Sequence, residues 1–189
     1  MSGTIPGNPA PPEGEPSAEA LNRRGMRLTE AERFDEAIAA FTAALEKEPG
    51  NTGILYNRGE ALRRAGRNAE AMSDLEEVLR REGEAPDLLL AMGLIAYEAE
   101  DFSAASARYE RALAIRPEFP EAWNDLGVVQ FRSEEYGRAR LSFEKAVTLR
   151  PDYGEAWFNL ADTYDELGLS NERKRALDRL RALDARDEE

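Results

Sequence analysis

The chain has 189 residues, of which 42% are hydrophobic and 33% charged, and its formal net charge is −13. This composition fits one soluble, highly helical domain, and so large a negative charge disfavours nucleic acid and anionic membranes, whose phosphates are bound by Lys and Arg. The absence of histidine and cysteine removes the commonest general base, the thiolate nucleophile and the usual ligands of zinc, haem and iron–sulfur clusters. We therefore expect no cofactor, no metal and no catalytic residue.

Residues 1–17 differ in composition from the rest of the chain. Pro, Gly, Ser and Glu dominate this segment, and its few apolar residues follow no helical or strand period. We expect a disordered tail, because so little apolar surface cannot offset the entropy lost on ordering. The segment lacks a basic leader followed by an apolar stretch, so we expect no secretory signal and a cytoplasmic location. The excess of Arg over Lys, 22 to 3, suggests a GC-rich bacterial genome.

From residue 18 onward, small residues return every 34 positions. The recurring residues are Gly25, Gly59, Gly93 and Gly127, and Ala37, Ala71, Ala105 and Ala139. A fixed period of about 20 to 50 residues indicates a unit too small to bury its own apolar face, stacked on copies of itself. The predicted domain, residues 18–187, divides without insertion into residues 18–51, 52–85, 86–119, 120–153 and 154–187, called units one to five below.

Each unit is predicted to be a pair of helices. Apolar residues recur at steps of three and four, which keeps one helical face buried. Proline follows the second helix of units one, three and four, at Pro49, Pro117 and Pro151, where it ends the helix. The recurring Gly and Ala leave room for a large side chain of the partner helix, namely Phe41, Leu75, Tyr109 or Phe143.

Unit four resembles the tetratricopeptide repeat family, whose pattern is W-x-x-L-G-x-x-Y, then A-x-x-x-F, then A and P. The residues at the pattern positions are Trp123, Leu126, Gly127, Gln130, Ala139, Phe143, Ala146 and Pro151. Only Gln130 departs, because the pattern has tyrosine at its position. The resemblance implies an all-α fold, a right-handed α-solenoid superhelix of antiparallel helix pairs. Units one and two depart most from the pattern, at Arg24, Arg58, Asn68, Val78 and Gly83, so we expect their junction to be the least stable.

The resemblance also implies a concave groove, lined by the first helix of each unit, in which peptides bind. Positions 2, 5, 6, 9, 12 and 13 of each unit would face this groove. We expect it to be basic and polar in units one and two, apolar in units three and four, and acidic in unit five. The predicted partner-binding residues are Tyr56, Asn57, Leu90, Leu94, Tyr97, Asn124, Val128, Phe131, Phe158 and Asp162.

Six large apolar residues on this stripe favour partner binding over a merely solvated face. They lie on three consecutive first helices, flanked by polar residues, as in an interaction patch with a polar rim: Leu90, Leu94, Tyr97, Val128, Phe131 and Phe158. The alternative is that some of them complete the core of a tightly wound groove. Substitution of Phe131 distinguishes the two, because an open groove residue contributes little to stability.

Two more specific functions are disfavoured. Some relatives grip the C-terminal carboxylate of chaperone tails with Lys, Arg and Asn, but the matching places here hold Asn22, Met26, Asn57, Asp87 and Ala91, and only Asn57 fits. Asp162 and Glu166 lie one helical turn apart beside Asp165, an array that could do acid–base work or hold a cation. No nucleophile or phosphate-binding loop lies nearby, so we interpret this array as a solvated acidic face.

We therefore expect a non-enzymatic scaffold or adaptor that holds an apolar and basic segment of another protein in its groove. The alternative function is self-assembly through the groove or the repeat ends, and the expected state is a monomer or a weak homo-oligomer. Arg173 and Arg181 replace apolar residues in the last helix, which suggests a polar cap and argues partly against end stacking. Leu177, Leu180 and Leu183 are expected to pack inward, on Trp157 and Leu160.

Overall fold

A computed structural model describes residues 16–187. In this part of the chain the regular structure is entirely helical, and ten helices follow one another. They are α1 (Ala18–Glu30), α2 (Phe34–Lys47), α3 (Thr52–Arg64), α4 (Asn68–Glu82), α5 (Pro86–Glu98), α6 (Phe102–Ile115), α7 (Pro120–Arg132), α8 (Tyr136–Leu149), α9 (Gly154–Glu166) and α10 (Ser170–Asp187). All of the predicted tail except Pro16 and Ser17 lies outside the described residues, and Ser17 caps α1 by accepting a hydrogen bond from the Ala20 backbone N–H at 3.2 Å.

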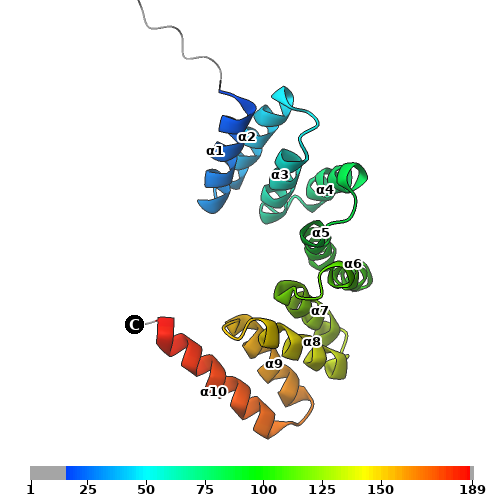
Figure 1. Cartoon of the computed structure of the whole chain (residues 1–189), viewed down its shortest axis with the longest axis vertical. Coiled ribbons are helices and arrows are strands. Elements are labelled where there is room, and N and C mark those ends of the chain that lie inside the picture. Colours follow the sequence, from blue (N-terminus) through cyan, green and yellow to red (C-terminus); the bar gives the residue numbers. More distant parts are fainter. Residues whose placement is uncertain (1–15, 188–189) are drawn as a thin grey trace, which may run out of the picture.

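The helix pairs stack side by side into an arc, as Figure 1 shows. Each helix packs against the next along the chain, and α1, α3, α5, α7 and α9 also contact one another in series on the inner side. The backbones of the second helices, α2, α4, α6, α8 and α10, do not pack against one another, and these helices lie on the outer side, where the ion pair of Arg138 and Glu110 bridges α8 and α6. The prediction of an all-α solenoid of antiparallel helix pairs is confirmed.

The same turn joins the two helices of every pair. After α1 the N–H of Glu32 donates to the carbonyl of Thr29 at 3.1 Å, and the N–H of Arg33 donates to the carbonyl of Leu28 at 2.9 Å, which satisfies carbonyls in the last turn of the helix. This turn requires a left-handed residue at its centre. The five central residues have φ between 58° and 75°: Glu32, Gly66, Glu100, Glu134 and Gly168.

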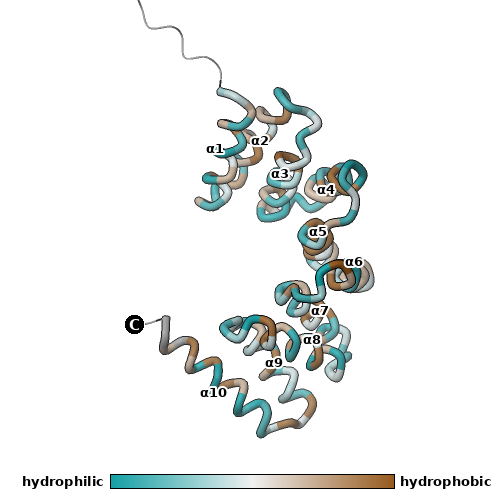
Figure 2. The backbone as a smooth tube through the Cα atoms, viewed as in Figure 1, coloured by the Kyte–Doolittle hydropathy of each residue, from teal (hydrophilic) through white to brown (hydrophobic). Residues whose placement is uncertain are grey.

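Small residues bring the two helices of each pair close together, as the period predicted. A Cβ added to Gly93 would lie 2.4 Å from a ring carbon of Tyr109, and one added to Gly127 would lie 2.6 Å from Phe143. The opposing alanines are fully buried at Ala37, Ala71, Ala105 and Ala139. The core therefore lies between the helices in three successive clusters, and Figure 2 shows apolar segments recurring along the whole arc.

The helices of neighbouring units pack least closely where α4 meets α5, between units two and three. This is one junction later than the junction of units one and two, which was expected to be the least stable. The two following junctions are filled by Phe119, which is buried, and by Tyr153, which packs on the core of units four and five. Unit two has Ala85 at the equivalent place, after Gly83 has ended α4 with a φ of 82°. The junction of units one and two is instead held by Arg58, whose guanidinium binds Asp74 in α4 and Thr42 in α2.

Candidate functional site

The inner wall of the arc is built by the five first helices in direct contact. Residues five, nine and twelve positions into each unit lie along one side of the first helix, next to the side that faces its own partner helix, and they form a stripe along the groove. The predicted apolar residues are there, but five of them are partly buried: Leu90, Leu94, Tyr97, Val128 and Phe131. Tyr56 is also partly buried and packs on the core of units one to three.

Phe158 is the most exposed large apolar residue of this stripe, with 51% of its surface exposed. It lies on α9, one turn from the exposed carboxylate of Asp162. A small cleft of about 70 Å³ lies between α7 and α9, lined by Val128, Phe131, Arg132, Phe143, Asn159 and Asp162. An exposed aromatic ring, an apolar cleft and a carboxylate therefore come together at this end of the groove.

Phe131 is not the open residue that its position suggested. Its ring packs against the core of units four and five and meets the ring of Tyr136 edge-on, with centroids 5.2 Å apart. Tyr97 makes a similar contact with Phe102 at 5.7 Å. The rings that begin α6 and α8 therefore cover part of the groove stripe, so Phe131→Ala would change stability as well as binding.

Asn124 is fully buried, so the prediction that it contacts a partner directly is wrong. Its Oδ1 accepts a hydrogen bond from Asn159 Nδ2 at 3.0 Å, and its own Nδ2 donates to Glu155 Oε1 at 3.3 Å. The same bond recurs in the first two units, where Asn57 Nδ2 donates to Asn22 Oδ1 at 3.1 Å. These asparagines connect neighbouring first helices and so fix the wall of the groove.

The basic end of the groove is neutralised by carboxylates. Arg63 forms ion pairs with Glu60 at 2.5 Å and with Glu98 of the next unit at 2.7 Å. Arg64 donates to the carbonyl of Thr29 at 3.2 Å, and its guanidinium lies 4.8 Å above the ring of Phe34. This end of the groove is polar, as expected, but the guanidinium groups of Arg63 and Arg64 already bind other groups of the same chain.

An acidic residue that the prediction did not single out lies in the middle of the groove. Burial raises the pKa of the Asp125 carboxyl to about 7, against the opposing effect of a hydrogen bond from Asn124, and the negative charges of Glu155 and Glu121 raise it further. Arg150 binds Glu121, whereas Asp125 has no ion pair with any cation of the described residues. Its place six residues into unit four, on the predicted stripe, was the signal that could have identified it.

The other carboxylates of the groove are mostly paired. Arg116 binds Asp87 through two hydrogen bonds, of 3.1 and 2.6 Å, and these lower the pKa of that carboxyl. Asp165 lies 3.4 Å from Arg173 of α10, so Arg173 joins the last two helices and is not part of an outer cap. Within residues 16–187 no cluster of three acidic side chains is arranged to hold a metal ion.

The comparison with protein families identifies the repeat. Models of the tetratricopeptide repeat match residues 22–87, 90–154 and 142–175. The chain belongs to the tetratricopeptide repeat family. Members of this family are generally non-enzymatic scaffolds for interactions between proteins. A search of curated protein sequences gave no significant match.

Solved tetratricopeptide repeat structures share the fold at low sequence identity. MamA is 21% identical, with a TM-score of 0.75 over 86% of this chain and 95% of its own. YrrB, described as a protein with an unusual peptide-binding site, is 20% identical, with a TM-score of 0.66 over 88% of this chain and 86% of its own. PilF of Pseudomonas aeruginosa is 17% identical, with a TM-score of 0.79 over 87% of this chain and 75% of its own.

The described helices are too short or too polar to cross a membrane. The last one, α10, buries Ala176 and Leu183 and keeps Leu177 and Leu180 partly buried, so its apolar side faces inward, and Leu180 approaches the start of α9 at Gly154. Its outer side is polar, and exposed Arg181 pairs with Asp178 at 3.0 Å.

Proposed function

We propose that this tetratricopeptide repeat protein is a non-enzymatic adaptor that holds a segment of another protein in its concave groove, between α5 and α9. The segment would be apolar and basic. The observation that carries the proposal is the end of the groove, where exposed Phe158 lies beside the α7–α9 cleft and the carboxylate of Asp162.

The chemistry of this end favours one kind of ligand. A large apolar side chain of the partner would cover Phe158 and enter the cleft, which removes apolar surface from water. A Lys or Arg of the partner would pair with Asp162, and a second cation would meet Asp125, which forms no ion pair within the described residues. The net charge of −13 attracts such a segment over a longer range, and added salt weakens that attraction.

The wall is suited to binding because it is fixed before the ligand arrives. The bonds from Asn159 to Asn124 and from Asn57 to Asn22 connect successive first helices. A preorganised surface loses less conformational entropy on binding. Catalysis is not part of the proposal, and the cytoplasmic location stays a prediction from the sequence.

A peptide array provides the test. Peptides of about 15 residues, varied in Lys and Arg content and in large apolar residues, would be screened with the whole protein, and the bound ones titrated by fluorescence anisotropy. We expect Phe158→Ala to weaken binding at least about fivefold, the equivalent of about 1 kcal/mol, and Asp162→Lys to weaken basic peptides most.

Ile115→Ala is the matched control, because Ile115 is an apolar residue of α6 with 42% of its surface exposed. It should leave every affinity unchanged. Equal binding of acidic and basic peptides would refute the proposal. Peptide affinities that change with neither Phe158→Ala nor Asp162→Lys would also refute it.

A further inference from the structure

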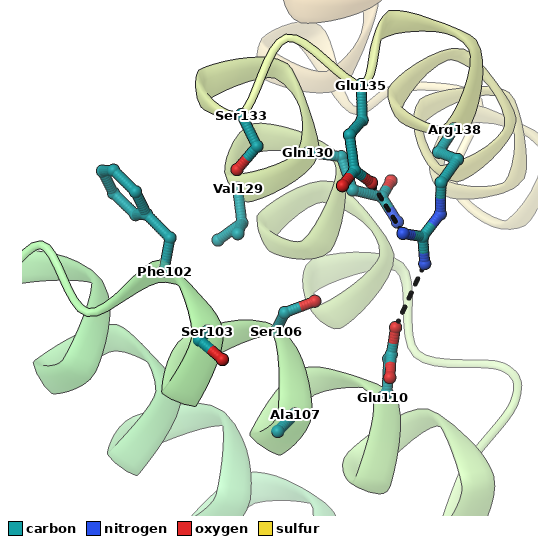
Figure 3. Close-up of a pocket in the computed structure, with 10 residues that line it drawn as sticks. All are labelled: Phe102, Ser103, Ser106, Ala107, Glu110, Val129, Gln130, Ser133, Glu135 and Arg138. Carbon is teal, nitrogen blue, oxygen red and sulfur yellow. Dashed lines mark hydrogen bonds and ion pairs between the residues drawn. The ribbon is translucent and has the colours of Figure 1, made fainter.

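A second concave surface lies on the outer side of the arc, between α6 and α8. It consists of two adjoining hollows of about 460 and 420 Å³, which share Glu110, Gln130 and Arg138. Figure 3 shows the more polar of the two, with Ser103 and Ser106 of α6 on one side and Gln130 of α7 and Ser133, which follows α7, on the other. We call this surface, made of both hollows, the α6–α8 trough.

The trough follows from the curvature of the solenoid. The backbones of α6 and α8 do not pack against each other, so a hollow remains over one side of α7 between them. Trp123, Leu126, Gln130 and Ser133, at steps of three and four, form its floor over about 15 Å. Small residues on the α6 wall, such as Ser106 and Ala107, leave the space unfilled.

One wall of the trough carries an apolar residue that neither the fold nor the groove explains. Leu141 of α8 has 57% of its surface exposed, more than any other large apolar residue of the described part. The equivalent residues of the other units are small or charged: Ala39, Ser73, Ala107 and Arg175. Leu141 borders a hollow whose apolar part is lined by Leu113, Ala114, Trp123 and Leu126, with Glu110, Gln130, Arg138 and Ser142 on its polar part.

The trough is also almost neutral in a strongly acidic protein. Its sixteen lining residues include only Glu110, Glu135 and Arg138 as charged groups, which gives a net charge of −1, whereas the whole chain has −13. Few charges at the centre are typical of a protein interface. Two copies of this chain repel each other over most of their surface but meet little repulsion here.

We propose that the α6–α8 trough binds the same surface of a second copy of this chain, in a two-fold dimer. Such an interface must be self-complementary, and this one carries an exposed apolar side chain and an apolar hollow on the same patch. Leu141 of each copy would enter the hollow of the other copy.

The charged groups at the centre of the trough fit the same arrangement. Arg138 pairs with Glu135 at 2.6 Å and with Glu110 across the trough at 3.4 Å, as Figure 3 shows. More than half of the Glu110 and Arg138 side chains is exposed. In a two-fold contact each guanidinium can therefore exchange Glu110 of its own chain for that of the other copy, and no charge is left unpaired.

The size of the surface predicts a weak dimer. The helices α6 and α8, of 14 residues each, are about 21 Å long and about 10–12 Å wide with their side chains, so the face that the two present together covers on the order of 500 Å² per copy. A total of about 1,000 Å² is at the lower end for specific interfaces. We expect dissociation in the micromolar range, and the concave groove remains free because it lies on the opposite side of the arc.

Sedimentation equilibrium over about 1 to 300 µM tests the proposal directly. Wild type should show a monomer–dimer equilibrium, and Leu141→Arg should weaken it at least about tenfold. Phe158→Arg is the matched control, since Phe158 is similarly exposed but lies in the groove, and it should leave the dimer intact. A purely monomeric wild type, a dimer that Leu141→Arg does not weaken, or one that Phe158→Arg breaks would each overturn it.

Disulfide trapping gives a second measurement that needs no disruptive substitution, because the chain has no cysteine of its own. An Ala114→Cys chain mixed with a Leu141→Cys chain should yield a mixed disulfide dimer in excess of random collision, and no excess would contradict the contact. Peptide binding by the groove should persist in Leu141→Arg, so failure of this proposal and failure of the adaptor function give different results.

Discussion

At the residue scale, the spacing of each helix pair is set by a glycine opposite a large side chain. Three of the four repeated glycines face an aromatic ring, at Phe41, Tyr109 and Phe143, and Gly59 faces the aliphatic Leu75. A ring cannot move aside in a close-packed core, whereas the end of a leucine side chain can change its rotamer. The four equivalent glycines therefore differ in how well they tolerate a methyl group.

We expect Gly93→Ala to lower the free energy of unfolding by about 1–3 kcal/mol, because the new Cβ would lie 2.4 Å from the Tyr109 ring. Gly59→Ala is the matched control, with its Cβ 3.0 Å from a terminal carbon of Leu75. It should be neutral or stabilising, since alanine favours a helix over glycine by about 1 kcal/mol. Urea denaturation measures both, and equal losses would show that ring contact is not the determinant.

Asp125 predicts a dependence of stability on pH. Because its pKa in the folded chain is raised to about 7, the folded state holds this proton more tightly than the unfolded state. The carboxyl therefore costs no stability below the unfolded pKa, and the cost grows as the pH rises through about 4 to 7.

Asp125→Asn keeps the size and polarity of the side chain and removes this cost. Its advantage in unfolding free energy over wild type should increase from under about 1 kcal/mol near pH 4 to about 3–4 kcal/mol near pH 8. Denaturation series at several pH values measure the difference between the two proteins. An advantage that does not vary with pH would contradict a raised pKa.

At the element scale, the ion pair of Arg58 and Asp74 holds three helices together. Arg58 Nε and Nη2 donate to the Asp74 oxygens at 2.7 and 2.8 Å, and Nη1 donates to Thr42 Oγ1 at 3.2 Å. Hydrogen bonding to Asp74 raises the pKa of the guanidinium. Asp74 is buried and only 23% of the Arg58 side chain is exposed, so the loss of either partner leaves a charge with poor access to water.

We expect Asp74→Ala to cost about 2–4 kcal/mol of stability. The double variant Arg58→Leu with Asp74→Ala copies unit five, which has Leu160 and Ala176 at these places, and it should lie within about 1 kcal/mol of wild type. Thermal or chemical unfolding distinguishes the two variants. If the double variant is as unstable as the single one, the pair contributes more than charge compensation.

At the scale of the whole molecule, the repeat period was sufficient to predict the solenoid. A regular return of Gly and Ala every 34 residues implies identical packing between pairs, and the first helices begin at that spacing, at Ala18, Thr52, Pro86, Pro120 and Gly154. The weakest contact could not be located by counting departures from the family pattern. It depends on what fills each junction, and Ala85 leaves unfilled the place that Phe119 and Tyr153 occupy elsewhere.

The groove was predicted less accurately than the fold, because the exposure of a stripe depends on how tightly the helices wind. Asn124 lies on the expected stripe but is buried between neighbouring first helices, and Phe131 is partly covered by Tyr136. The α6–α8 trough was missed for the same reason, since it arises from the separation of the outer helices. The sequence period identifies the side of a helix on which a residue lies, whereas the curvature of the solenoid determines how much of that side is exposed.

The central claim is that the concave face, and in particular its α7–α9 end, holds the partner segment. Site-specific photocross-linking tests it most directly, with a photoreactive residue in place of Asp162 in the groove or of Lys145 on the exposed outer side of α8. A bound apolar and basic peptide should cross-link from position 162 and not from position 145. Cross-linking from position 145 alone would contradict the account.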